Sequence, residues 1–124
     1  MENHRYTITT ADTLVRRIPK VPSHCKIIEG RIMATSGAFK TNTGEDGLSV
    51  DILAMTRLLQ AVQNPLNNYA GLLKAEVPMN EKYECRHDPK DYNQAHALIV
   101  GNTRPIAKKL ASACTVQEVF PEIL

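Results

Sequence analysis

The stretch from His87 to His96 contains two imidazoles, two carboxylates and two side-chain amides. An imidazole titrates near neutral pH, so it can move protons, and a neighbouring carboxylate fixes which ring nitrogen carries the proton. The sequence therefore makes His87 and His96 candidate catalytic residues and Asn93 a candidate ligand-binding residue. The structural alternative is favoured, because Asp88-Pro89 and Asn93 are common turn formers and histidines that begin a buried strand commonly bond to a backbone carbonyl.

A second group combines two neighbouring arginines with four polar residues of nearby segments: Arg16, Arg17, Ser36, Lys40, Ser49 and Asp51. Arg17 is the third candidate catalytic residue, and the four polar residues are candidate ligand-binding residues. An arginine on a concave surface beside serines would hold a phosphate or carboxylate. Strand alternation turns one arginine inward, and an inward arginine paired with Asp51 would be structural, which is the favoured interpretation.

The sequence predicts no metal site and no cofactor. The histidine spacing fits no zinc motif, and a third ligand would have to come from a distance, as His24 or Cys25. Gly44 and Gly47 belong to an expected turn rather than a phosphate-binding loop, and no nucleophile-elbow serine is found.

The elements that must position these residues alternate short strands with turns. Strands are expected at 13–18, 71–77, 83–87 and 95–100, the last two pairing as a hairpin, and 26–33 as an irregular strand or a covering loop. A further hairpin is expected to join 36–40 to 48–51.

Two helices complete the expected outline. Asp51 would cap the first, whose apolar residues recur at spacings of three and four until Asn64-Pro65. Thr103 and Pro105 would begin the second, which runs to Cys114. The fold class predicted is α+β, with a largely antiparallel sheet and about two helices.

The length of 124 residues predicts one domain over 1–124, with a loose or edge-docked start at 1–11 and a docking tail at 115–124. No apolar run approaches the roughly 20 residues of a membrane span, so no membrane association is expected. Three widely spaced cysteines and the polar N-terminus favour reduced thiols and a cytoplasmic protein.

Five segments carry a resemblance to a group of small uncharacterised bacterial proteins. They are Arg17-Ile18-Pro19, Ser36 to Lys40, Leu48 to Asp51, His87-Asp88-Pro89 and Asn93 to Gly101. The group has Arg-Ile-Pro, Ser-Ala-Phe-Lys, Leu-Ser-Val-Asp and Asn-Pro-Ala-His-Ala segments, whereas this chain has Gln94 in place of proline and Gly37 in place of serine or alanine. The resemblance covers about residues 14 to 112 and implies a bacterial protein.

The opening also resembles, more faintly, that of RES-type toxins, which have an ADP-ribosyltransferase-like fold and consume NAD. The likeness is an arginine on the first strand, followed by a segment of small residues. It implies a role for Arg17 alone, because the family's later tyrosine and glutamate have no counterpart that can be located.

Three functions stay open. A non-enzymatic accessory protein that binds a protein partner is favoured narrowly, since size, balanced charge and the apolar tail suit it. The alternative is a small enzyme acting on a nucleotide or phosphorylated substrate through Arg17, Ser49, His87 and His96. Nucleic-acid binding is a third candidate, less favoured, through the cations Arg16, Arg17, Lys40, Lys108 and Lys109.

Overall fold

The computed structural model describes residues 5–121 and contains a six-stranded, wholly antiparallel sheet with strand order β6-β7-β4-β1-β5-β8. The strands are β1 (Thr13–Pro19), β4 (Gly47–Ile52), β5 (Asn68–Lys74), β6 (Cys85–His87), β7 (His96–Val100) and β8 (Thr115–Gln117). A separate hairpin pairs β2 (Cys25–Ile28) with β3 (Arg31–Ala34). The predicted α+β class is confirmed.

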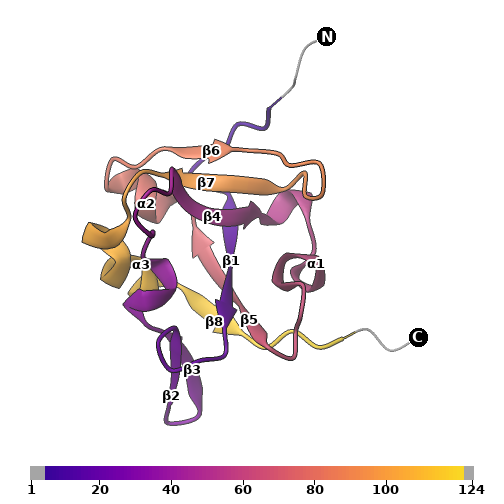
Figure 1. Cartoon of the computed structure of the whole chain (residues 1–124), viewed down its shortest axis with the longest axis vertical. Helices are drawn as coiled ribbons and strands as arrows, with labels where there is room; N and C mark the ends of the chain where they lie inside the picture. The colour runs from indigo at the N-terminus through magenta and orange to yellow at the C-terminus, as the bar shows by residue number, and fades with distance from the viewer. Residues whose placement is uncertain (1–4, 122–124) are drawn as a thin grey trace.

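The sheet is covered on both faces by short helices, of which Figure 1 shows α3 and α1 on opposite sides of β1. The helices are α1 (Leu58–Val62), α2 (Glu76–Asn80) and α3 (Ala107–Ala113), with 3-10 turns η1 (Ser36–Phe39), η2 (Leu53–Met55) and η3 (Arg104–Ile106). The main core packs β1 residues Leu14 and Ile18 against Leu110 of α3 and Phe39 of η1. A smaller core around Val15 lies under α1.

The sheet divides into two halves between its central strands β1 and β4. These strands pair at only two positions, Leu14 with Ile52 and Val15 with Asp51. By contrast, β1 follows β5 along the whole of Thr13–Pro19. In Figure 1, β4, β7 and β6 run roughly horizontally, whereas β1 runs vertically and β5 and β8 run obliquely behind it. Beyond Val15 the two central strands therefore separate, and their facing edges are open to side chains.

The expected hairpin between 36–40 and 48–51 is wrong. Residues Ser36–Phe39 form the turn η1, and β4 pairs instead with β1 and β7. The reason is a close backbone approach at Gly37, where an added Cβ would lie 2.1 Å from the carbonyl oxygen of Ser23. The turn places Ala38 and Phe39 in the main core.

Two further expectations are corrected. The 26–33 segment forms both strands of the β2–β3 hairpin, because Glu29 and Gly30 both adopt positive φ and make a tight turn. Asp51 does not cap a helix but lies within β4, and the next α-helix, α1, is only 5 residues long. Tertiary pairing of β4 with two neighbours outweighs the helical spacing of the apolar residues.

Several other predictions agree with the structure. The strands expected at 13–18 and 95–100 are β1 and β7, and the strand expected at 83–87 is the shorter β6, paired with β7. The strand expected at 71–77 is correct only to Lys74: β5 begins earlier, at Asn68, and Glu76–Asn80 form α2. Tyr6 docks against edge strand β6, and the tail contributes β8 and a buried Val119. Residues 1–4 and 122–124 of the expected termini lie outside the described part. Within the described chain, no helix is long and apolar enough to cross a membrane.

Thr103 occupies the expected N-cap position, that of η3, but its side chain makes no capping bond and instead ties the start of η3 to the end of η1. The fully buried hydroxyl donates to the Phe39 carbonyl and accepts from the amide of Thr41 at 3.2 Å. Thr103→Val keeps the shape and removes both bonds, so we expect the free energy of unfolding to fall by about 1–3 kcal/mol. Urea denaturation measures this, with exposed Thr115→Val as the matched control. Equal stability of the two variants would contradict the assigned role.

Candidate functional site

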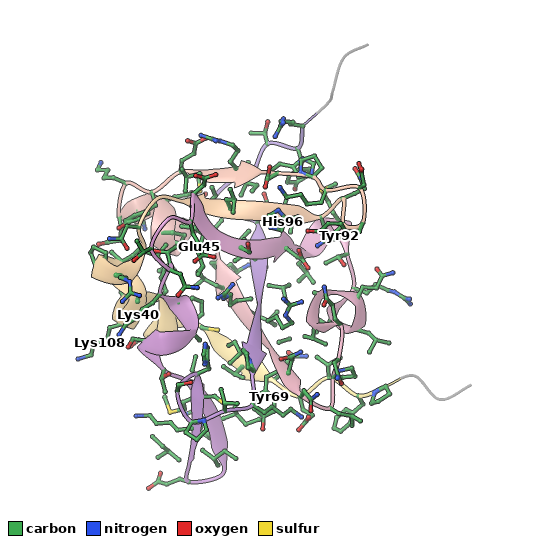
Figure 2. The ribbon with its side chains drawn as sticks, in the orientation of Figure 1. Lys40, Glu45, Tyr69, Tyr92, His96 and Lys108 are labelled. Carbon is green, nitrogen blue, oxygen red and sulfur yellow. The ribbon has the colours of Figure 1, made fainter. Side chains whose placement is uncertain are left out.

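A pocket of about 220 Å³ lies where the sheet divides between β1 and β4. Its walls come from β1, β4, β7, the end of α1 and the loop between β6 and β7. The lining residues are Val15, Arg16, Arg17, Ser49, Val50, Asp51, Ala61, Gln63, Tyr92, Asn93 and His96. Figure 2 shows His96 and Tyr92 together at the end of β7 nearest α1.

The pocket contains five of the candidate residues named from the sequence. They are Arg17, Ser49, Asp51, Asn93 and His96. Strand alternation explains this: Ser49 and Asp51 lie two apart on β4, and His96 of β7 lies opposite Asp51. Val15 lies opposite Asp51 on the other side, which places Arg17, two residues further on, on the same face.

Three candidate residues lie elsewhere. Ser36 begins the turn η1 and Lys40 follows its last residue; this turn packs against α3 on the other face of the sheet, and neither residue lines the pocket. Figure 2 shows Lys40 beside Lys108, well away from His96. His87 lies opposite Ala97, the neighbour of His96, so the two histidines point to opposite faces of the hairpin.

His87 is a buried structural connection in this fold. Its Nδ1 accepts the amide proton of Tyr6 at 2.8 Å, so Nε2 carries the ring proton and donates to the Gln94 carbonyl at 2.7 Å. Arg5 also donates to the His87 carbonyl at 2.9 Å. These contacts hold the N-terminal segment on β6 and leave neither nitrogen of the His87 ring free for a ligand.

Arg16 fills the space between the separated strands. Its Nε donates to the Ala38 carbonyl at 2.9 Å, and one terminal nitrogen donates to the Ser49 carbonyl at 2.8 Å. Neither pairing with Asp51 nor a ligand contact is needed to explain its burial. Desolvation lowers the pKa of Arg16, and the neighbouring charge of Arg17 lowers it further. Arg16 thus brings a positive charge to the pocket while fixing the position of the Ser49 backbone.

Arg17 differs from its neighbour in being exposed and without a hydrogen bond or ion pair to any residue of 5–121. Asp51 lies on the same face, but its Oδ1 accepts a hydrogen bond from the side-chain amide of Asn93 at 2.8 Å. A guanidinium that is free at the rim of a pocket can pair with an anion that enters it.

His96 connects the pocket to a carboxylate. Its Nδ1 lies 2.9 Å from the Asp88 carbonyl oxygen and 3.2 Å from Oδ2 of the same residue, both of which are acceptors. Nδ1 therefore carries the proton, and in the neutral ring Nε2 is an acceptor facing the Ser49 hydroxyl at 3.2 Å. A hydrogen bond from Lys90 holds the pKa of Asp88 below its ordinary value, with the charges of Lys90 and His96 acting in the same direction.

The loop between β6 and β7, which begins with Asp88, contains a tight turn held by backbone hydrogen bonds. Lys90 and Asn93 exchange backbone hydrogen bonds of 3.0 Å, and Asn93 also accepts the amide proton of Ala95 at 3.1 Å. Tyr92 at its tip is 84% exposed and lines the pocket. Asp88 and Tyr92 were not named as site residues from the sequence. The hairpin pairing of 83–87 with 95–100 was a signal for Asp88, because it places this residue beside His96.

The cations considered for nucleic-acid binding do not gather on one surface. Arg16 and Arg17 belong to the pocket, whereas Lys109 pairs with Glu81 at 3.0 Å.

No family model, curated protein or solved structure matches this chain. What the pocket does must follow from its own residues. Within residues 5–121 no three His, Cys, Asp or Glu side chains are grouped as metal ligands would be.

Cys25, Cys85 and Cys114 are free thiols, and a raised pKa makes two of them less reactive. Burial raises the pKa of Cys85 to about 11 and that of Cys114 to about 12.

At about pH 8 we expect iodoacetamide to alkylate both cysteines at least tenfold more slowly in the native protein than in urea, because thiolate is the reacting form. Since both folded-state values exceed the ordinary 9.0, stability is also expected to fall as the pH rises from 9 towards 11. Rapid native alkylation, measured by mass spectrometry, would contradict this burial.

Proposed function

We propose that the protein is a small enzyme that acts on a phosphorylated small molecule bound between β1 and β4. The observation that carries the proposal is the convergence of Arg17, Ser49 and His96 from three separate strands or strand ends around one pocket. A convergence of a cation, a hydroxyl and an imidazole is what a phosphate ester needs for binding and proton transfer.

Charge and size support a phosphate group. Arg16 and Arg17 bring two positive charges, whereas Asp51 is the one carboxylate among the lining residues and is engaged by Asn93. A guanidinium matches phosphate oxygens in a two-pronged hydrogen bond. The volume of about 220 Å³ suits a phosphoryl end of a ligand better than a whole nucleotide, with Tyr92 exposed at the rim where a base or sugar would emerge.

His96 supplies the chemistry beyond binding. Its Nε2 faces the pocket as a proton acceptor while Nδ1 is fixed by Asp88, so one nitrogen is committed to structure and the other is available for proton transfer. This is the arrangement expected of a general base or acid. His87, which the sequence also made a candidate, has no part in this proposal.

Release of inorganic phosphate from a panel of nucleoside monophosphates and sugar phosphates tests the proposal. The wild-type protein is expected to release phosphate from at least one member. His96→Gln should lower that rate by about 100-fold or more, the usual value of a general acid or base. Arg17→Gln should raise the substrate concentration at half-maximal rate by about tenfold, the equivalent of one lost charged contact.

Lys40→Gln is the matched control for Arg17→Gln. Lys40 is also an exposed cation, but it lies away from the pocket on the η1 side of the sheet (Figure 2). Its removal should leave the rate unchanged if the local chemistry of the pocket matters rather than overall charge. Equal losses in the two variants, or no release from any phosphate ester, would overturn the proposal.

Binding of a protein partner remains a second candidate function, and one surface favours it. Three apolar side chains of the β2–β3 hairpin are exposed: Ile27 at 65%, Ile28 at 43% and Met33 at 39%. Apolar residues gathered on an exposed hairpin are typical of contact surfaces. Co-purification from native cells is expected to recover one stoichiometric partner with the wild type and to lose it with Ile27→Asp. The control Leu66→Asp, at a position elsewhere that is even more exposed, 74%, should retain it.

A further inference from the structure

Three polar side chains lie in a row beside the pocket, joined by one close polar contact and one hydrogen bond, while the hydrogen bond of His96 Nδ1 itself goes to the Asp88 backbone carbonyl at 2.9 Å. Asp88 Oδ2 lies 3.2 Å from His96 Nδ1, and His96 Nε2 lies 3.2 Å from Ser49 Oγ. Asp88 is held in turn by Lys90, whose Nζ lies 3.1 Å from Oδ2. The order acid, imidazole and hydroxyl is the one that activates serine in hydrolases of unrelated folds.

The position of Ser49 fits a nucleophile rather than a structural hydroxyl. Its side chain is exposed and lines the pocket, on a strand whose alternate residues Leu48 and Val50 are buried. Its backbone is fixed from behind by the bond from Arg16 to the Ser49 carbonyl. A hydroxyl exposed on a rigid strand, with an acceptor nitrogen in reach, needs no rearrangement to attack a bound group. The 3.2 Å separation is ordinary for a catalytic hydrogen bond before substrate binds.

We propose that Ser49 is a covalent nucleophile towards phosphorus, with His96 as its general base and Asp88 as the residue that positions His96. The inference rests on the proposed function, because it places the phosphoryl group of the same substrate against Ser49. It goes further by assigning a two-step reaction with a phosphorylated serine and by naming a phosphate monoester as the substrate class.

The two steps balance without any further reactant except water. In the first, Ser49 Oγ forms a bond to phosphorus as the bond from phosphorus to the leaving alcohol breaks; the serine proton passes to His96 Nε2 and then to the leaving oxygen. In the second, His96 takes a proton from water, whose oxygen attacks phosphorus. The bond between Oγ and phosphorus breaks, and the serine regains its proton. Arg16 and Arg17 are placed to offset the negative charge on the phosphoryl oxygens.

A fluorophosphonate probe tests the nucleophile directly, because serine attack on it expels fluoride and leaves a stable bond to phosphorus. We expect intact-mass spectrometry to show one adduct per wild-type chain, and peptide mapping to place it on Ser49. Ser49→Ala should abolish the adduct, whereas Ser112→Ala, which removes an exposed serine of α3, should leave the labelling rate unchanged. His96→Gln should slow labelling by about 100-fold or more.

Asp88→Asn tests the positioning role with a readout that stability alone would not move. In the wild type, the nitrogen-15 shifts of the His96 ring should report a proton on Nδ1. The Asp88 backbone carbonyl that accepts from Nδ1 at 2.9 Å is kept in the variant, so the ring proton should stay on Nδ1. Labelling should nevertheless slow by about tenfold or more, because the imidazolium that forms during the reaction loses the facing carboxylate. An unchanged labelling rate, with the ring proton still on Nδ1, would remove the Asp88 carboxylate from the assignment.

Titration of the same samples with inorganic phosphate separates this inference from the function on which it rests. If phosphate perturbs the resonances of Arg17 and His96 but no adduct forms on Ser49, the covalent step is wrong and the phosphate pocket stands. If phosphate perturbs neither residue, the proposed function fails as well. An adduct on any other serine, with Ser49 unmodified, also overturns the inference.

Discussion

Phe39→Ala is expected to lower the free energy of unfolding by about 3–5 kcal/mol, the range for removing a fully buried aromatic ring. Phe39 is 0% exposed and packs in the main core, while its carbonyl accepts the bond from Thr103. The preceding residue, Ala38, holds the guanidinium of Arg16. Loss of the ring should therefore weaken both the core and the turn that anchors the pocket.

Phe120→Ala is the matched control for this variant, because Phe120 is 77% exposed. Its truncation should change stability by less than about 0.5 kcal/mol, as for other surface positions. Chemical denaturation of the three proteins measures the difference. A loss under about 1 kcal/mol in Phe39→Ala would mean that η1 is not part of the cooperative fold.

Arg16→Met and Arg17→Met are expected to show that Arg16 mainly stabilises the fold, whereas the adjacent Arg17 mainly binds the ligand. Methionine keeps the apolar stem of arginine and removes the charged group. Arg16→Met leaves the Ala38 and Ser49 carbonyls without their donor, so it should cost about 3 kcal/mol of stability. Arg17 has no partner within residues 5–121, so its variant should lose less than about 0.5 kcal/mol.

Phosphate affinity should follow a different pattern in the two variants. Arg17→Met should weaken phosphate binding by about tenfold with its fold intact. Arg16→Met should weaken it too, through displacement of Ser49 as well as through lost charge. Denaturation curves and isothermal titration on the same preparations measure both effects. If Arg17→Met proved the less stable variant, the assignment of the two arginines would be reversed.

The co-location of Arg17, Ser49 and His96 was within reach of the sequence. Alternation along predicted strands 13–18, 48–51 and 95–100 keeps Ser49 and Asp51 on one face, and the sequence identified all three strands. It did not reveal that β4 lies between β1 and β7. The pocket lies where β1 and β4, which pair at only two positions, diverge, and Arg16 reaches from β1 to the carbonyls of Ala38 and Ser49 there. Such a contact joins residues more than 20 positions apart and leaves no local periodicity.

The misplaced residues have equally physical causes. Ser36 and Lys40 were assigned to a strand because polar turn residues follow them, but the tight packing of Gly37 against Ser23 makes a 3-10 turn instead. His87 was grouped with His96 by closeness in sequence. The register of the β6–β7 hairpin places the two side chains on opposite faces. A register shifted by one residue would have placed both on the same face.

The most direct test of the account is a phosphate titration followed by amide resonances of the labelled protein. We predict saturable shifts concentrated at Arg16, Arg17, Ser49, Asn93 and His96, which surround the pocket. Lys40 and Lys108, which do not line the pocket and lie at the left of Figure 2, should serve as internal controls and stay unperturbed. Shifts concentrated at these two lysines, or spread evenly over all surface cations, would contradict the assignment of this pocket as the functional site.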